Sequence, residues 1–316
     1  MKKYKAVVIG CGKIGAQEWL YPQNVKPVTH AAAYFLHPHI ELVGLFDIDP
    51  GKLKKAKKFF LGVPLYHSAE KMLKETQPDI VSIATHPNTH DTFVAMAANY
   101  GAKAILCEKP MADSLKKAER MVAMCARKKC LLFINHSRHF DSLINAWQGK
   151  IKRGALGEIL QAHCLYHNGA FNNGTHAIDL LRMFLGEAQK VSGFYNAVTS
   201  NPKRDKNIDA MIFFKNGARA IMQSVSEGMG MTEWVFYGTR GSLALKHLGM
   251  EAHYNNAKEG APRSLIAQTV LHIIACLGKK EKPKSTGTDA LEISKVLFAL
   301  KKSAQRNGKV IPINSK

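Results

Sequence analysis

Residues 5–15 read KAVVIGCGKIG, a short apolar run that leads directly into three spaced glycines. Gly10, Gly12 and Gly15 have the Gly-x-Gly-x-x-Gly spacing of a turn that joins a strand to a helix and binds a dinucleotide. The first glycine permits the sharp bend, the second lets the backbone approach a pyrophosphate, and the third allows close packing of helix on strand. The helix N-terminus then faces the phosphates. The predicted cofactor contacts in this stretch are Gly10, Gly12, Lys13, Ile14 and Gly15.

The first 135 residues alternate short apolar runs with longer amphipathic segments, which is the pattern of a parallel sheet covered by helices on both faces. The predicted strands are 5–9, 41–46, 80–84, 104–107 and 131–134, with a weaker one near Leu65. The predicted helices are 68–76, 89–100 and 114–128, with N-caps at Ser68, Thr89 and Ser114. We therefore expect an α/β chain whose residues 1–135 form a doubly wound (Rossmann) dinucleotide-binding domain.

After residue 135 strand-like segments follow one another directly, at 159–166, 190–196, 210–214, 218–224 and 234–237. The pair Asn216-Gly217 lies between two of them and predicts an antiparallel hairpin. Residues 136–316 are thus predicted to form an α+β domain for substrate binding and oligomerisation, with an open, mostly antiparallel sheet. A closing helix at 287–307 is expected to pack back on the N-terminal domain. An uncovered sheet face needs a partner, so we expect a homodimer or homotetramer through this sheet.

Asp47 follows the second predicted strand, where a carboxylate binds the adenosine ribose hydroxyls, which favours NAD over NADP. It lies 32 residues after Gly15, more than the motif anticipates, and Pro22 and Pro27 interrupt the intervening chain. The Gln17–Thr29 segment is therefore an insertion. It is interpreted either as a loop over the cofactor or substrate or as a surface excursion, and both readings stay open.

The net charge of +21 raises the question of an anionic partner. The lysines cluster in helix-like and loop segments without a recognisable nucleic-acid module, so a solvated surface is the preferred reading and nucleic acid is not expected as a partner. The six cysteines lack the paired spacing of a zinc site or a redox dithiol, and the spacing of the histidines does not bring them together around one ion. No metal is therefore expected. With no signal-peptide pattern and no long apolar run, a cytoplasmic protein without a membrane span is predicted.

Two further polar segments follow predicted parallel strands, where ligands bind in open α/β sheets. The first includes Thr85, Pro87, Asn88 and His90, and the second reads Cys-Glu-Lys-Pro at 107–110. A lysine held there by a following proline can donate a hydrogen bond to a substrate oxygen.

These motifs, in this order, resemble the Gfo/Idh/MocA family, the relatives of glucose-fructose oxidoreductase and inositol dehydrogenase. The resemblance covers the whole chain and includes the glycine turn, Asp47, Pro87-Asn88-x-His90, Glu108-Lys109-Pro110, Arg138-x-Phe140-Asp141, Gly154-x-Leu156-Gly157-Glu158-Ile159, Gly174-x-His176-x-x-Asp179 and the closing helix. It implies an NAD-dependent oxidoreductase acting on CH-OH groups. The cofactor contacts that it adds to the glycine turn are Asp47, Thr85, Pro87, Asn88, His90, Glu108 and Lys109.

By the same resemblance Lys109 and His176 serve the reaction. We hypothesise that His176, in the first turn of a predicted helix, removes a proton from a substrate hydroxyl while Lys109 stabilises the alkoxide. The positive helix end is expected to hold the imidazole neutral. Asn172 stands where the family often has an aspartate, so it either orients a ligand or shapes a turn. The candidate substrate contacts are Arg138, Tyr166, Asn173 and Arg182.

The predicted function is hydride transfer between NAD and a ring hydroxyl or keto group of a sugar, sugar derivative or nucleotide-linked sugar. Two alternatives remain open. One is an NAD-dependent glycosidase that uses transient oxidation, and the other is a non-catalytic regulator that senses NAD and sugar.

Overall fold

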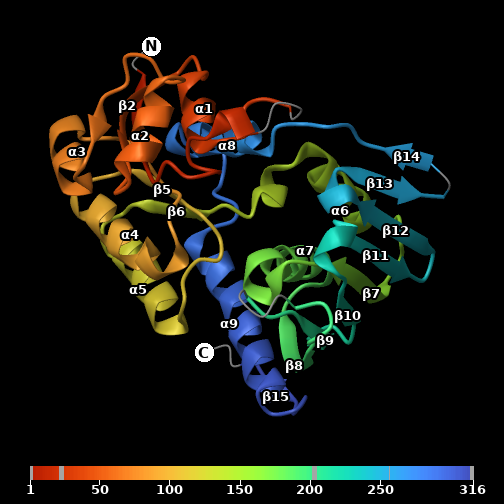
Figure 1. Cartoon of the computed structure of the whole chain (residues 1–316). Coiled ribbons are helices and arrows are strands. Elements are labelled where there is room, and N and C mark those ends of the chain that lie inside the picture. Colours follow the sequence, from red (N-terminus) through yellow and green to blue (C-terminus); the bar gives the residue numbers. More distant parts are fainter. Residues whose placement is uncertain (1–2, 21–24, 201–204, 256, 314–316) are drawn as a thin grey trace. The chain divides into compact units, whose positions relative to one another are not determined.

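A computed structural model describes residues 3–20, 25–200, 205–255 and 257–313. The chain forms two compact units (Figure 1). The first contains Met1–Phe140 and Pro262–Leu291, and the second contains Asp141–Ala261 and Glu292–Lys316. The predicted second domain contains all residues after 135. The structure instead returns a late segment to the first unit, because the apolar side chains of helix α8 (Leu265–Leu277) are part of that unit's core.

The sheet of the first unit has six parallel strands in the order β3-β2-β1-β4-β5-β6, the order of a doubly wound dinucleotide fold. The predicted parallel sheet is therefore confirmed. Its strands are β1 (Tyr4–Ile9), β2 (Ile40–Phe46), β3 (Leu65–Tyr66), β4 (Ile80–Ile83), β5 (Ala104–Cys107) and β6 (Leu131–Ile134). Its helices, besides α8, are α1 (His30–Phe35), α2 (Pro50–Lys57), α3 (Ala69–Thr76), α4 (His90–Asn99) and α5 (Leu115–Arg127).

Alternate residues of β1 supply two separate cores, one on each face of the sheet. Ala6 and Val8 pack with residues of α1, α2 and α8, and Val7 and Ile9 pack with residues of α3, α4 and α5. The predicted N-caps Ser68 and Ser114 accept hydrogen bonds from the backbone of α3 and α5. The Thr89 hydroxyl caps no helix, because it hydrogen-bonds to Thr85 and to the carbonyl of His86 instead.

The second unit contains a nine-stranded sheet with the order β14-β13-β12-β11-β7-β10-β9-β8-β15. Among the strand pairs that the described residues form in this sheet, only β7–β10 is parallel and the others are antiparallel. The predicted hairpin at Asn216-Gly217 joins β9 to β10, with Gly217 at a φ of +90°. The strands are β7 (Ile159–Tyr166), β8 (Ala188–Tyr195), β9 (Ile208–Phe214), β10 (Arg219–Ser224), β11 (Glu233–Gly238), β12 (Gly241–Lys246), β13 (Glu251–Tyr254), β14 (Ala257–Glu259) and β15 (Ile311–Pro312).

One face of this sheet is covered by helices α6 (Ser142–Lys152), α7 (Gly174–Leu185) and the later part of α9 (Gly287–Ala304), whose apolar residues share its core. Along β10, Ala220 and Met222 are buried on this face while Ile221 on the opposite face is exposed. The predicted closing helix is present as α9. Its first residues, up to Leu291, belong to the first unit, and the rest belong to the second. None of the helices in the described ranges combines the length and apolar character needed to cross a bilayer.

Candidate cofactor and catalytic site

The glycine turn connects β1 to the segment before α1, and each glycine meets a different environment. A Cβ on Gly10, whose φ is +101°, would lie 2.6 Å from the carbonyl oxygen of Ala84. A Cβ on Gly15 would lie 1.9 Å from the carbonyl oxygen of Gly10, whereas one on Gly12 would meet nothing within 4 Å. The protein's own packing therefore requires the first and third glycines, and the second borders open space where a ligand can approach the backbone.

Asp47 lies at the end of β2, directly beside this turn. Its Oδ2 accepts a hydrogen bond from the backbone N–H of Cys11 at 2.7 Å, and its Oδ1 accepts one from Asp49 at 2.8 Å. The Nζ of Lys52 lies 3.7 Å from Oδ1. Because a carboxylate can accept about four hydrogen bonds, Asp47 keeps acceptor capacity for two ribose hydroxyls.

The carboxylate of Glu18 links the beginning of the inserted segment Gln17–Thr29 to its end. Residues 21–24 of this segment, including Pro22, lie outside the described residues. Glu18 accepts hydrogen bonds from the backbone N–H groups of Val28 and Thr29 at 2.9 and 2.8 Å, and Lys26 Nζ lies 3.2 Å away. Burial acts to raise the pKa of Glu18, but these partners hold it below its usual value. The described part of the insertion thus ends at a fixed point, the N-cap Thr29 of α1.

A buried polar network begins at His30, the first residue of α1, which has no solvent exposure. Its Nδ1 lies 2.9 Å from the hydroxyl of Ser82 on β4, and its Nε2 lies 3.0 Å from Glu108 Oε1 at the end of β5. Asn135, after β6, donates to the same Oε1 at 2.6 Å, and the Tyr34 hydroxyl lies 2.7 Å from that of Ser82. The network therefore joins α1 to three neighbouring strands beneath Glu108.

This environment fixes the charge of Glu108. Burial acts to raise its pKa, but hydrogen bonding and charge from His30, the charge of Lys109 and the hydrogen bond from Asn135 lower it to about 2. The backbone N–H of Lys109 donates to Glu108 Oε2 at 3.2 Å. Glu108 was predicted as a cofactor contact; its carboxylate instead points into the protein and positions the backbone of Lys109. No local sequence pattern links His30, Ser82 and Asn135 to this site, so their part in the network could not be predicted.

His90 was also predicted to contact the cofactor, and its contacts correct that prediction. The ring is buried, with Nε2 3.1 Å from the carbonyl of Thr85 and Nδ1 3.2 Å from that of Met111. Burial lowers its pKa despite these carbonyls, so the ring is neutral and donates to one of them at a time. His90 therefore joins the loops that follow β4 and β5. Thr85 and Pro87 are partly exposed and Asn88 is exposed, so these three remain available to a ligand.

The second unit carries the other predicted catalytic segment, and α7 does not start there as a free helix end. A π-helical segment, η4 (Gly169–Asn173), precedes it and leads directly into Gly174. The Oδ2 of Asp205 accepts hydrogen bonds from the backbone N–H groups of Phe171 and Asn172 at 2.5 and 2.9 Å. The N–H groups at the start of this helical stretch thus lie upstream of His176, and a carboxylate binds two of them. The effect of the helix end on the charge of His176 stays a prediction.

The predicted substrate contacts fall in different surroundings. Tyr166 is fully buried; its hydroxyl donates to the carbonyl of Ile208 at 3.0 Å and accepts from the N–H of Ile208 at 2.7 Å. It is therefore a structural residue and not a substrate contact. Arg138 is buried in the first unit, whereas Asn173 and Arg182 are partly exposed in the second. Within the described residues, no group of three or more His, Cys, Asp or Glu side chains could hold a metal ion.

Comparison with known proteins adds independent findings. Residues 4–136 match the profile of an oxidoreductase family with an NAD-binding Rossmann fold, and residues 167–244 match the GFO/IDH/MocA C-terminal domain. D-apiose dehydrogenase of Paraburkholderia graminis is 25% identical over 100% of this chain and 91% of its own length. Inositol 2-dehydrogenase 2 of Saccharopolyspora erythraea is 25% identical over 57% of this chain and 53% of its own.

Among solved structures, the WlbA dehydrogenase of Bordetella pertussis, in complex with NADH and UDP-GlcNAcA, superposes with a TM-score of 0.83. The match covers 100% of both chains at 19% identity. At that identity the likeness shows the fold, and it extends over both units.

Proposed function

Because the chain belongs to the Gfo/Idh/MocA family of NAD-binding oxidoreductases, we propose that it transfers a hydride between NAD and a sugar-type substrate. The reacting group is a ring hydroxyl or keto group of a sugar, sugar derivative or nucleotide-linked sugar. The relatives named as dehydrogenases of D-apiose and of inositol support this class. The observation that carries the proposal is the buried network of His30, Glu108 and Asn135, in which Glu108 accepts a hydrogen bond from the backbone N–H of Lys109 just after β5.

We propose that the first unit binds the cofactor. The open space at Gly12 fits a pyrophosphate next to the backbone, with Lys13 and Ile14 beside it, and the remaining acceptor capacity of Asp47 fits ribose hydroxyls. A carboxylate at this position disfavours a 2′-phosphate by charge, so NAD is favoured over NADP. When bound, NAD supplies the hydride acceptor or donor.

We propose that Lys109 and His176 carry the proton chemistry. In the oxidation direction a ring nitrogen of His176 accepts the hydroxyl proton, and the Lys109 ammonium stabilises the negative charge that develops on the substrate oxygen. Asn172, four residues before His176, would orient the substrate or the imidazole by hydrogen bonding, since an amide cannot balance an imidazolium by charge. Asn173, Arg182 and Arg138 remain candidate substrate contacts.

We further propose that the chain forms a homodimer or homotetramer through the uncovered face of the nine-stranded sheet. The register places Val235, His163, Ile221 and Met211 side by side in one row across β11, β7, β10 and β9. Ile221 and Met211 are 45% and 39% exposed, which leaves an apolar surface on neighbouring strands. An Ile221→Lys variant should sediment as a smaller species than the parent protein, and unchanged mass would contradict this interface.

Localisation is proposed to be cytoplasmic. All six cysteines are free and buried, which is the usual state of thiols in a reducing compartment.

The cofactor proposal is tested by NADH fluorescence titration of the parent protein and of Asp47→Ala. The Asp113→Ala variant, which removes an exposed carboxylate on the same unit, is the matched control. We expect NADH binding that is weakened at least tenfold by Asp47→Ala and unchanged by the control. If the parent protein binds no NADH, the enzymatic proposal is wrong.

The catalytic proposal is tested on a sugar found to be oxidised by the parent protein. His176→Ala and Lys109→Ala should each lower kcat by about 10²- to 10⁴-fold while NADH affinity stays within about twofold for His176→Ala. Near-normal turnover of His176→Ala would remove that residue from the chemistry.

A further inference from the structure

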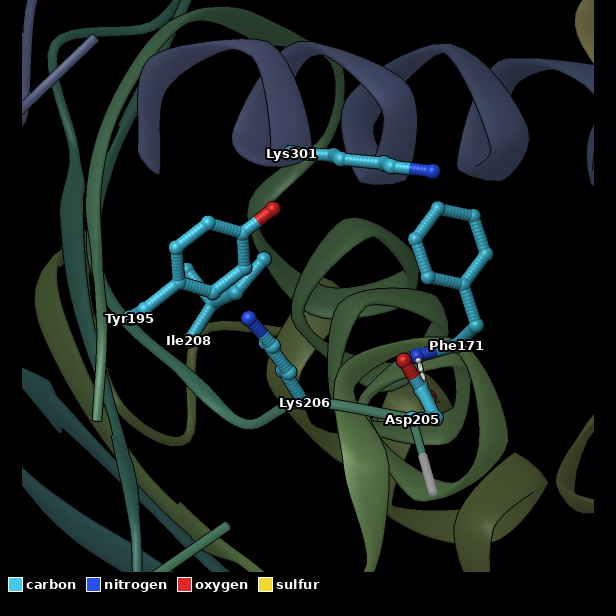
Figure 2. Close-up of a pocket in the computed structure, with 6 residues that line it drawn as sticks. All are labelled: Phe171, Tyr195, Asp205, Lys206, Ile208 and Lys301. Atoms are coloured by element: carbon cyan, nitrogen blue, oxygen red, sulfur yellow. Dashed lines mark hydrogen bonds between the residues drawn. The ribbon is translucent and has the colours of Figure 1, made fainter. Parts of the chain in front are cut away.

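The second unit contains a cavity of about 270 Å³ next to the segment that carries Asn172. Figure 2 shows Tyr195 and Lys206 on one side and Phe171 on the other, while Lys301 extends over the space from α9. The cavity lies among η4, the end of β8, the start of β9 and α9. Its lining residues are Phe171, Tyr195, Asp205, Lys206, Ile208 and Lys301.

Two ammonium groups border this cavity, and each makes a cation–π contact with an aromatic ring. Lys206 Nζ lies 5.2 Å from the ring centroid of Tyr195, and Lys301 Nζ lies 5.8 Å from that of Phe171. Within the described ranges, neither ammonium group makes a hydrogen bond or an ion pair. Asp205 also lines the cavity, and its Oδ2 accepts hydrogen bonds from the backbone N–H groups of Phe171 and Asn172, so two ammonium groups and one carboxylate border the space.

The lining offers donors to a ligand. Each ammonium has three N–H groups, and the phenol of Tyr195 can add an O–H. Burial and the nearby charge of Asp205 raise the pKa of Tyr195, so the phenol keeps its proton at neutral pH. A set of two cations and a hydroxyl matches a group with several anionic oxygens. A phosphate has three such oxygens, whereas a carboxylate offers two in one plane.

The cavity is tied to the proposed catalytic segment by a short piece of rigid chain. Phe171, which lines it, is five residues before His176 in one continuous helical stretch, about 7 Å along the axis. Asp205 fixes the backbone of Phe171 and Asn172 from the cavity side. The cavity is therefore lined by the same helical stretch that carries His176.

We propose that this cavity binds a phosphate group of the substrate, so that the sugar is a sugar phosphate or a nucleotide-linked sugar. Lys206 and Lys301 hold the phosphate oxygens, Tyr195 donates a third hydrogen bond, and the ring face of Phe171 covers the apolar side. This inference rests on the proposed function for its assignment to the substrate, whereas phosphate binding itself can be measured without turnover.

The first experiment measures binding of inorganic phosphate to the full chain by ³¹P NMR titration. The test variant is Lys206→Met with Lys301→Met, and the control variant is Lys54→Met with Lys116→Met, which removes the same charge from exposed lysines elsewhere. We expect saturable binding that is at least tenfold weaker in the test variant and unchanged in the control. Absence of binding, or equal weakening in both variants, would overturn the site. A paired Lys206→Arg and Lys301→Arg variant with native circular dichroism should recover most of the affinity.

NADH titration of the same samples separates this inference from the proposed function. Phosphate binding without NADH binding would contradict the enzyme and leave the anion site standing. In the second experiment, a sugar phosphate and its parent sugar are compared as substrates. The phosphate ester should have a KM at least tenfold lower, and the test variant should lose this preference without a change in the parent sugar's kcat. Equal KM values in the parent protein would overturn the substrate assignment.

Discussion

The Glu108→Gln variant tests whether the buried network beneath Lys109 stabilises the fold through the charge of one carboxylate. Burial acts to raise the pKa of Glu108, but His30, Lys109 and Asn135 lower it from 4.5 to about 2. The difference between these two values corresponds to about 3 kcal/mol of stability at pH 7. The variant keeps the shape of the side chain and removes only its ionisation, so it should lose about that amount at neutral pH.

The loss should depend on pH in one direction. A depressed folded-state pKa contributes stability that is fully present above the unfolded value and disappears as pH falls through the folded value. With folding moving the pKa from 4.5 to about 2, the contribution of Glu108 shrinks below pH 4.5. About 1 kcal/mol should remain at pH 3. The two proteins should therefore approach each other in stability as the solution is acidified.

The assay is urea unfolding followed by circular dichroism, in steps from pH 7 to pH 3. Glu119→Gln, an exposed glutamate on α5 of the same unit, serves as the control and should differ from the parent protein by less than about 0.5 kcal/mol at every pH. The reasoning is refuted if Glu108→Gln is as stable as the parent at pH 7, or if its deficit stays constant down to pH 3.

Two other substitutions test the geometry directly. Gly15→Ala should destabilise the first unit by about 1–3 kcal/mol, since its Cβ would lie 1.9 Å from the carbonyl oxygen of Gly10. Gly12→Ala should unfold at the same urea concentration as the parent protein, because its Cβ meets nothing within 4 Å, and it should weaken NADH binding at least tenfold. Urea titration and NADH fluorescence of the pair check this, and equal destabilisation would contradict it. Tyr166→Phe should lose about 1–3 kcal/mol because Ile208 loses both partners, with KM for the sugar unchanged; a KM that rises with intact stability would return Tyr166 to the substrate site.

The fold of the first unit could be predicted from the sequence because its signals are local. Gly10, Gly12 and Gly15 fix the turn after β1, and alternating segments mark the six strands that the structure contains. Local patterns fail where a side chain has a choice of partners. Thr89 has the residue type of an N-cap, yet the carbonyl of His86 and the hydroxyl of Thr85 are closer to its hydroxyl group.

Long-range pairings could not be predicted. His30 and Glu108 are 78 residues apart, and only the strand order brings α1, β4 and β5 together around them. Strands β12 to β15 were missed, since an edge strand such as β14 has only three residues, all exposed, and hence no apolar alternation. In the π-helical turn before α7, the backbone N–H of Phe171 donates to the carboxylate of Asp205. Asp205 lies 34 residues later in the sequence, so no local pattern predicts this contact.

The return of α8 to the first unit determines the order in which the chain can complete its cores during synthesis. Ile266, Val270 and Ile273 belong to the same core as Ala6 and Val8, although nearly the whole second unit lies between them in the sequence. Residues 141–261 must therefore emerge from the ribosome before α8 can emerge and complete the N-terminal core. The unit that is begun first is finished late, and a chain cut before Pro262 would leave part of that core uncovered for chaperones to bind.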